Sequence, residues 1–243
     1  MASLKLLAFD TSTEILSIAV QAGLGVPAIA RTAPGGAQAS ATLLPLVLQL
    51  LAEAGLSLRA LDAIAFGRGP GSFTGLRTAC AVAQGLGFGS GVPVLPIDTL
   101  LAVAEQARAE AGVTRVVALL DARMDEVYCA SYAYEAGHWV EHGSPRLARP
   151  EDVQVPVGWA LAGNALELYA ARLPAAGTRL TALPTAAALL RLAPAALAAG
   201  PFHAAADALP LYVRDKVAHT TQERAALKAQ AGGPAGAARP TTT

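Results

Sequence analysis

Two segments of the chain, residues 6–15 and 117–127, follow one pattern. Each begins as a short apolar strand, places an aspartate at its end (Asp10 and Asp121), and passes through a polar turn into a second apolar strand. A repeated unit of this kind, followed in both copies by helical segments, indicates a duplicated α/β fold. The sequence therefore predicts two related halves with a cleft between them, faced by both aspartates.

The remaining elements follow from periodicity and turn residues. The first half, residues 1–98, is expected to form strands at 4–9, 15–22, 26–31, 63–66 and 94–96, with helices at 42–54 and 74–88. The second half, residues 99–218, is expected to form a helix to 111, strands at 116–121, 127–135 and 138–142, and helices at 165–173 and 185–198. Residues 219–243 are rich in Ala, Gly, Pro and Thr and are expected to form a flexible tail.

A glycine-rich segment, Gly67–Arg77, connects a predicted strand to a predicted helix. Backbone amides at a helix start attract anions, and glycine lets another group come close. The segment has Ser72 where a dinucleotide-binding motif needs glycine, and no lysine follows as in a P-loop. It therefore predicts neither nucleotide motif.

Small residues recur every four positions in the helix that follows: Gly75, Ala79, Ala83 and Gly87. Such a face allows another helix to approach closely, although the rule is best supported in membranes. Packing within the chain and contact with another subunit are equal alternatives for this face.

The turn Asp10-Thr11-Ser12 offers a carboxylate, hydroxyls and backbone amides, and Asp121 occupies the matching turn of the second copy. Such turns can hold a phosphate or hydrated magnesium. The structural alternative is a turn in which Asp10 accepts hydrogen bonds from the residues that follow it. The two interpretations stay open at this point.

Composition excludes several functions. Lys plus Arg and Asp plus Glu are 18 each, so no net charge attracts a polyanion such as tRNA. No lysine lies between positions 6 and 215, which argues against lysine-based phosphate or Schiff-base chemistry.

The H-x-x-E-H pattern at His138–His142 resembles a zinc peptidase motif, but the surrounding residues predict a hairpin arm rather than the required helix. Two isolated cysteines and the absence of a signal pattern predict a cytoplasmic protein without a membrane segment.

Four motifs carry a resemblance to a known family: L-A-F-D-T-S-T-E at 7–14, G-R-G-P-G-S-F-T-G-L-R at 67–77, D-A-R-M-D-E-V-Y at 121–128 and P-L-Y-V-R at 210–214. From about Leu4 to Ala218 the chain resembles the TsaB family, also called YeaZ. The resemblance implies a duplicated actin-like, Hsp70-like ATPase fold related to ribonuclease H. It also implies a non-catalytic dimerisation subunit in the threonylcarbamoylation of N6 of the tRNA adenosine next to the anticodon.

The family's partners are implied in the same way. The catalytic paralogue TsaD forms a heterodimer with this subunit, the ATPase TsaE joins them, and tRNA binds only through the complex. The resemblance leaves open a homodimer of the chain alone. It implies no intrinsic cofactor, with ATP or ADP and magnesium at the complex interface as an option. The competing interpretation is a stand-alone ATPase or peptidase of the same fold.

The residues expected at or beside the subunit contact by this resemblance belong to the glycine-rich loop and the helix after it. They are Arg68, Gly69, Gly71, Ser72, Thr74, Gly75, Ala79, Ala83 and Gly87. Asp10, Thr11 and Ser12 match the first phosphate turn of the fold, which a degenerate paralogue can retain without its ligand. Family members often have a histidine just before the first long helix, where Ala39 and Ser40 stand here.

Overall fold

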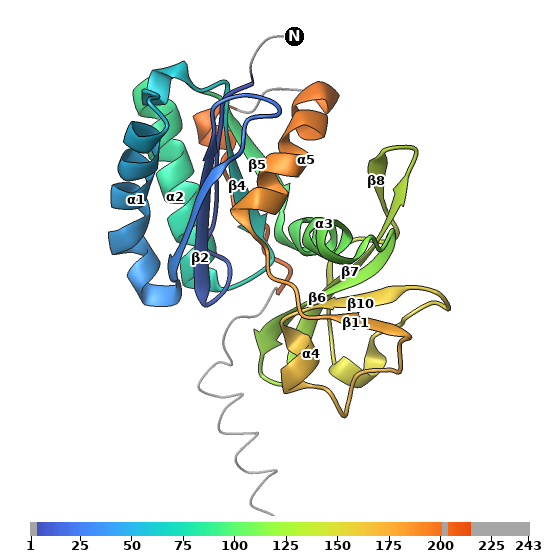
Figure 1. Cartoon of the computed structure of the whole chain (residues 1–243). Coiled ribbons are helices and arrows are strands. Elements are labelled where there is room, and N and C mark those ends of the chain that lie inside the picture. The colour runs from blue at the N-terminus through green and yellow to red at the C-terminus, as the bar shows by residue number, and fades with distance from the viewer. Residues whose placement is uncertain (1–3, 201–203, 215–243) are drawn as a thin grey trace, which may run out of the picture. The chain divides into compact units, whose positions relative to one another are not determined.

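The computed structural model describes residues 4–200 and 204–214, which form two mixed sheets and the helices packed on them (Figure 1). The first sheet has the order β3-β2-β1-β4-β5. Strand β2 pairs antiparallel with both β1 and β3, whereas β4 pairs parallel with both β1 and β5. The strand bounds are β1 Leu6–Asp10, β2 Ile15–Gln21, β3 Ile29–Pro34, β4 Ala63–Gly69 and β5 Val94–Asp98.

The second sheet repeats the topology of the first. Its order is β11-β10-β6-β7-β8. Written from the opposite edge, the order is β8-β7-β6-β10-β11, which corresponds strand by strand to β3-β2-β1-β4-β5 of the first sheet. Strand directions also correspond, because β6 pairs antiparallel with β7 and parallel with β10. The bounds are β6 Arg115–Arg123, β7 Glu126–Glu135, β8 His138–Glu141, β10 Ala160–Gly163 and β11 Thr178–Leu180, with β9, Arg146–Ala148, beside β7. The predicted duplication is confirmed.

Helices cover both faces of the first sheet. Helices α1, Ala39–Glu53, and α2, Phe73–Ser90, pack on one face, and α5, Ala186–Ala199, packs on the other (Figure 1). Burial on both faces explains why β1 and β4 are almost wholly apolar rather than alternating. Helix α3, Thr99–Ala111, packs on the second sheet, whose opposite face is covered by α4, Ala165–Leu168, and nearby loops.

Each half contributes a helix to the other half. Helix α3 follows the first sheet in sequence but packs on β6 and β7, whereas α5 follows the second sheet and packs on β1 and β5. The two sheets therefore belong to one compact unit, which includes the described residues up to Val213. The predicted boundary at residue 98 separates the strands of the two sheets. It does not divide the helices in the same way, because α5 lies after this boundary and packs on the first sheet. The predicted tail, 219–243, lies outside the described residues.

Several predicted boundaries were wrong. Helix α1 begins at Ala39 rather than Thr42, because a short 3-10 turn, Gly36–Gln38, leads directly into it and leaves Pro45 inside the helix. Strand β3 begins three positions later than predicted, at Ile29. Helix α4 ends at Leu168, and the short strands β9, β10 and β11 were not predicted. Among the described residues, no helix is both long enough and apolar enough to cross a membrane.

Candidate subunit interface

The glycine-rich loop is packed onto the turn that follows β1. The Thr11 hydroxyl donates a 2.7 Å hydrogen bond to the Gly75 carbonyl, and the Ser72 amide donates a 2.8 Å bond to the Ser12 carbonyl. A Cβ atom at Gly75 would lie 1.8 Å from the Thr11 carbonyl oxygen, and one at Gly71 would lie 2.7 Å from Ser12. Glycine is needed at these two positions because the backbone of the turn occupies the space of a side chain.

Asp10 lies fully buried beneath this loop. Its Oδ1 accepts hydrogen bonds from the amide of Ser12 at 2.8 Å and from the Ser12 hydroxyl at 2.6 Å. Its Oδ2 has no hydrogen-bond partner among the described residues and lies against Gly67, where a Cβ atom would come within 1.8 Å of it. Burial raises the pKa of the Asp10 carboxyl to about 6, although both bonds from Ser12 oppose the shift.

The predicted phosphate turn is therefore closed in this structure. Asp10, Thr11 and Ser12 are all buried, and the loop that would have to admit a phosphate is hydrogen-bonded to the turn itself. The turn residues do not fit a nucleotide phosphate in this conformation. The alternative interpretation, a turn in which Asp10 accepts hydrogen bonds from Ser12, describes what is found.

Asp121 holds the corresponding turn of the second half together. Its Oδ1 accepts from the Arg123 amide at 2.9 Å and from the Tyr169 hydroxyl at 3.0 Å, while its own amide donates to Asn164. Arg123 in turn forms an ion pair with Glu14, just after the β1 turn. The two duplicated turns are thus linked through Arg123 and Glu14, and the side chain of Asp121 is occupied by contacts within its own half.

The small-residue face of α2 is buried inside the chain. Gly75, Ala79, Ala83 and Gly87 are all buried, and Ala79 and Ala83 belong to the core between α2 and the first sheet. Of the two alternatives for this face, packing within the chain holds. The prediction that these four residues contact another subunit is wrong, since their lack of side-chain bulk serves close packing of α2 on its own strands.

The loop residues predicted at the interface also make contacts within the chain. Arg68 pairs with Asp98 at 2.5 Å, and buried Gly69 lies beneath the Leu211 carbonyl. Gly71 and Ser72 are half-buried against Ser12. A subunit contact by Arg68, Gly71 or Ser72 stays a prediction, whereas Gly69 is covered.

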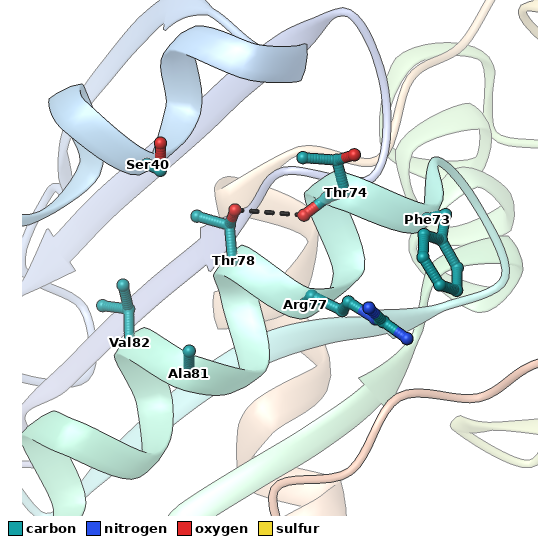
Figure 2. Close-up of a pocket in the computed structure, with 7 residues that line it drawn as sticks. All are labelled: Ser40, Phe73, Thr74, Arg77, Thr78, Ala81 and Val82. Carbon is teal, nitrogen blue, oxygen red and sulfur yellow. Dashed lines mark hydrogen bonds between the residues drawn. The ribbon is translucent and has the colours of Figure 1, made fainter.

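The opposite, outer face of α2 forms a groove with α1. The groove has a volume of about 420 Å³ and includes Thr74 from the predicted set. Figure 2 shows Ser40 of α1 across from Thr78 of α2, with Arg77 and Phe73 toward one end. The full lining consists of Ser40, Phe73, Thr74, Arg77, Thr78, Ala81 and Val82.

The outer surface of α1 and α2 is apolar and nearly uncharged. The sequences of these two helices contain only two charged residues, Glu53 and Arg77. Large apolar side chains are nevertheless exposed on them: Leu44 by 44%, Leu48 by 59%, Phe73 by 41% and Phe88 by 70%. A contiguous exposed apolar surface is typical of a protein contact site. Leu44 and Leu48, one turn apart on α1, and Phe73, which lines the groove, are the exposed apolar side chains that such a contact would cover.

An aromatic and arginine cluster borders the groove. The Arg77 guanidinium carbon lies 3.8 Å from the Phe73 ring centroid, and its Nε donates a 3.1 Å hydrogen bond to the Tyr212 hydroxyl. The Phe73 and Tyr212 rings are 5.6 Å apart. Tyr212 belongs to the P-L-Y-V-R motif, which is fixed to the loop by a bond from the Leu211 amide to the Arg68 carbonyl.

The peptidase-like pattern is a strand, as the surrounding residues predicted. His138–Glu141 forms β8, paired antiparallel with β7, and the His142 amide donates to the Ser131 carbonyl. The helical geometry that the H-x-x-E-H motif requires is therefore not formed here. Within residues 4–200 and 204–214, no group of three or more His, Cys, Asp or Glu side chains is placed to hold a metal ion.

Comparisons with known proteins agree with this fold. The model of the family described as TsaD, tRNA N6-adenosine threonylcarbamoyltransferase, matches residues 33–238. The structure of YeaZ from Pseudomonas aeruginosa superposes with a TM-score of 0.80 at 44% identity, covering 86% of this chain and 99% of that one. The two related α/β halves therefore form a duplicated actin-like fold, and the chain falls within the larger group of threonylcarbamoyladenosine proteins that share it.

The particular family follows from curated relatives. The tRNA threonylcarbamoyladenosine biosynthesis protein TsaB of Escherichia coli is 35% identical over 88% of this chain and 96% of its own length. The protein of the same name from Haemophilus influenzae is 36% identical over 89% of this chain and 96% of its own length. The chain belongs to the TsaB family, also known as YeaZ.

Sequence reasoning missed most of the groove. Only Thr74 was predicted, whereas Ser40, Phe73, Thr78, Ala81 and Val82 were not assigned to a site, and Arg77 was noted only as part of the loop. The available signal was the near absence of charge in two amphipathic surface helices.

Proposed function

We propose that this chain is a non-catalytic scaffold subunit in the threonylcarbamoylation of tRNA, holding the catalytic subunit TsaD against the outer face of α1 and α2. The relatives named TsaB take part in threonylcarbamoyladenosine biosynthesis according to their names. The observation that carries the docking proposal is the groove between α1 and α2, together with the exposed apolar side chains beside it.

The size and chemistry of this face suit a stable contact. Helix α2 has 18 residues, which gives a length of about 27 Å. That length is comparable to the extent of a contact that buries about 800 Å² on each partner. Covering the exposed parts of Leu44 and Leu48 would contribute about 1 kcal/mol each. The small groove residues Ser40, Ala81 and Thr78 leave room for side chains of a docked helix.

The proposed lack of independent catalysis is supported by the closed turn after β1. A nucleotide-hydrolysing protein of this fold would need the turn open to phosphate, yet Thr11 and Ser12 are bonded to the loop that covers them. The other predicted partners extend the proposal. The ATPase TsaE joins the pair, tRNA binds through the assembled complex, and the complex works in the cytoplasm. ATP or ADP with magnesium at the complex interface stays a prediction.

A matched pair of arginine substitutions tests the docking face. Ala81 and Ala109 are both exposed on helices, but Ala81 lines the groove and Ala109 lies on α3. In calorimetric titrations with the TsaD-family protein of the same organism, Ala81→Arg should weaken binding at least 100-fold, whereas Ala109→Arg should bind as the wild type does. Circular dichroism should show both variants folded. Equal, undiminished binding by both would refute docking at this face.

A further inference from the structure

Arg77 is held in one orientation by two contacts. The guanidinium is stacked on Phe73, and Tyr212 engages its Nε. Among the described residues, none accepts a hydrogen bond from the two terminal nitrogens of Arg77. An arginine fixed by stacking presents a planar pair of donors suited to bidentate contact with a carboxylate.

Helices α1 and α2, which form the groove, provide no free carboxylate to pair with Arg77. The only carboxylate in α1 or α2 is Glu53, whose Oε2 pairs with Arg31 and whose Oε1 accepts from Gln49. Glu53 also lies thirteen residues beyond Ser40, about 20 Å along α1. A partner that covers this face removes Arg77 from water, and burying an arginine without a carboxylate is costly.

We propose that Arg77 determines which partner this face accepts, by pairing with a carboxylate on a docked subunit of different sequence and by disfavouring a second copy of this chain. The inference rests on the proposed function, since it names the chemistry of the partner at the same face. A symmetric pair of identical chains would bury two copies of Arg77 and offer from α1 and α2 only Glu53, which is already engaged. A heterologous partner can supply a free carboxylate.

Tyr212 and Phe73 act as positioning residues for Arg77. Tyr212 comes from the C-terminal P-L-Y-V-R motif, which is anchored to the first half by the Leu211 amide. Just before the motif, the Ala208 carbonyl accepts a hydrogen bond from the Gln84 side chain of α2. The motif therefore brings a phenol to the edge of the groove. Tyr212→Phe keeps the ring contact with Phe73 and removes only the hydrogen bond to Arg77, so it should weaken the heterologous complex by less than loss of Arg77 does.

The experiment measures two affinities for each variant of the full chain: binding to the TsaD-family subunit by calorimetry, and self-association by sedimentation equilibrium. Arg77→Met should weaken the heterologous complex roughly 10-fold to 100-fold and leave self-association unchanged or stronger. Its heterologous affinity should also depend less on salt than that of the wild type. Arg59→Met, an exposed arginine outside the groove, serves as the control and should change neither affinity.

The outcomes separate this proposal from the one on which it rests. Heterologous binding that is lost in Ala81→Arg but unchanged in Arg77→Met would overturn the role of Arg77 and leave the docking face in place. Equal weakening of both affinities in Arg77→Met would overturn partner selection. If the wild type failed to bind the TsaD-family subunit, both the proposed function and the role of Arg77 would be wrong.

Discussion

Replacing Asp10 by asparagine should change how the stability of the protein depends on pH. The carboxyl group is fully buried, its Oδ2 has no partner among the described residues, and its pKa rises from 3.8 to about 6. The difference between these two pKa values means that burial costs the charged carboxylate about 3 kcal/mol more free energy than it costs the neutral carboxyl group. The asparagine side chain that replaces it in the variant carries no charge at any pH.

The sign of the effect follows from proton binding. Between about pH 4 and pH 6 the folded wild type holds a proton on Asp10 that the unfolded chain has released, so stability falls as the pH rises. Above the pKa that Asp10 has in the folded protein, the buried charge lowers the free energy of unfolding of the wild type by the full amount, about 3 kcal/mol. The free energy of unfolding of Asp10→Asn minus that of the wild type should therefore increase by about 2.5 kcal/mol from pH 4 to pH 7.5, because the unfolded chain has already released part of this proton at pH 4.

Urea unfolding of both proteins at half-unit pH intervals measures this difference. Any constant cost of the asparagine amide shifts the whole difference curve but not its slope, and other titrating groups cancel between the two proteins. Ser12→Ala provides a second variant, because it removes the 2.6 Å bond that favours the charged carboxylate and should raise the pKa of Asp10 further. A difference curve that is flat, or that falls with pH, would show that Asp10 is not desolvated as described.

Further substitutions test the packing account by urea unfolding. Gly75→Ala should lower the free energy of unfolding by about 3 kcal/mol or more, because its Cβ would meet the Thr11 carbonyl. Gly85→Ala, whose Cβ would meet no atom within 4 Å, should raise the free energy of unfolding by about 0.5–1 kcal/mol. If Gly85→Ala were the less stable of the two variants, the assignment of the buried face of α2 would be wrong. Glu105→Gln should cost about 3 kcal/mol, since this buried carboxylate accepts from Arg108, Arg191 and Trp139, and a loss below about 1 kcal/mol would contradict the network's importance. Thr185→Ala should cost about 1 kcal/mol, because its hydroxyl accepts from the Ala188 amide at the start of α5, and no change would contradict the cap.

The duplication could be predicted because its signal is local. An apolar strand that ends in aspartate and turns into a second strand is legible in sequence at both Asp10 and Asp121, and the structure repeats the whole sheet topology around these strands. The packing of α3 and α5 on the sheet of the other half could not be predicted from the sequence. Helix α3 is apolar on one side and α5 is apolar at every position except Arg191, and neither pattern indicates which sheet the helix covers.

The site could be predicted only in part because small residues are ambiguous. Gly75 and Ala79 allow close approach of any neighbour, and the sequence does not distinguish a strand of the same chain from a helix of another. Arg77 shows a second reason, which is that some of its contacts are not local in the sequence. Its stacking on Phe73 is a contact one helical turn away, but its bond to Tyr212 joins residues 135 positions apart and depends on the complete fold.

A reconstituted transfer assay tests the central claim most directly. With ATP present, transfer of the threonylcarbamoyl group from its adenylate to tRNA, with release of AMP, is measured in the presence of the TsaD-family subunit, the TsaE-family ATPase and this chain. The measurement is repeated with each of the three proteins omitted. We predict no product from this chain without the TsaD-family subunit, product when all three are present, and a large loss when Ala81→Arg, but not Ala109→Arg, replaces the wild type. Product formed by this chain without the TsaD-family subunit, or full activity when this chain is omitted, would contradict its role as a required, non-catalytic scaffold.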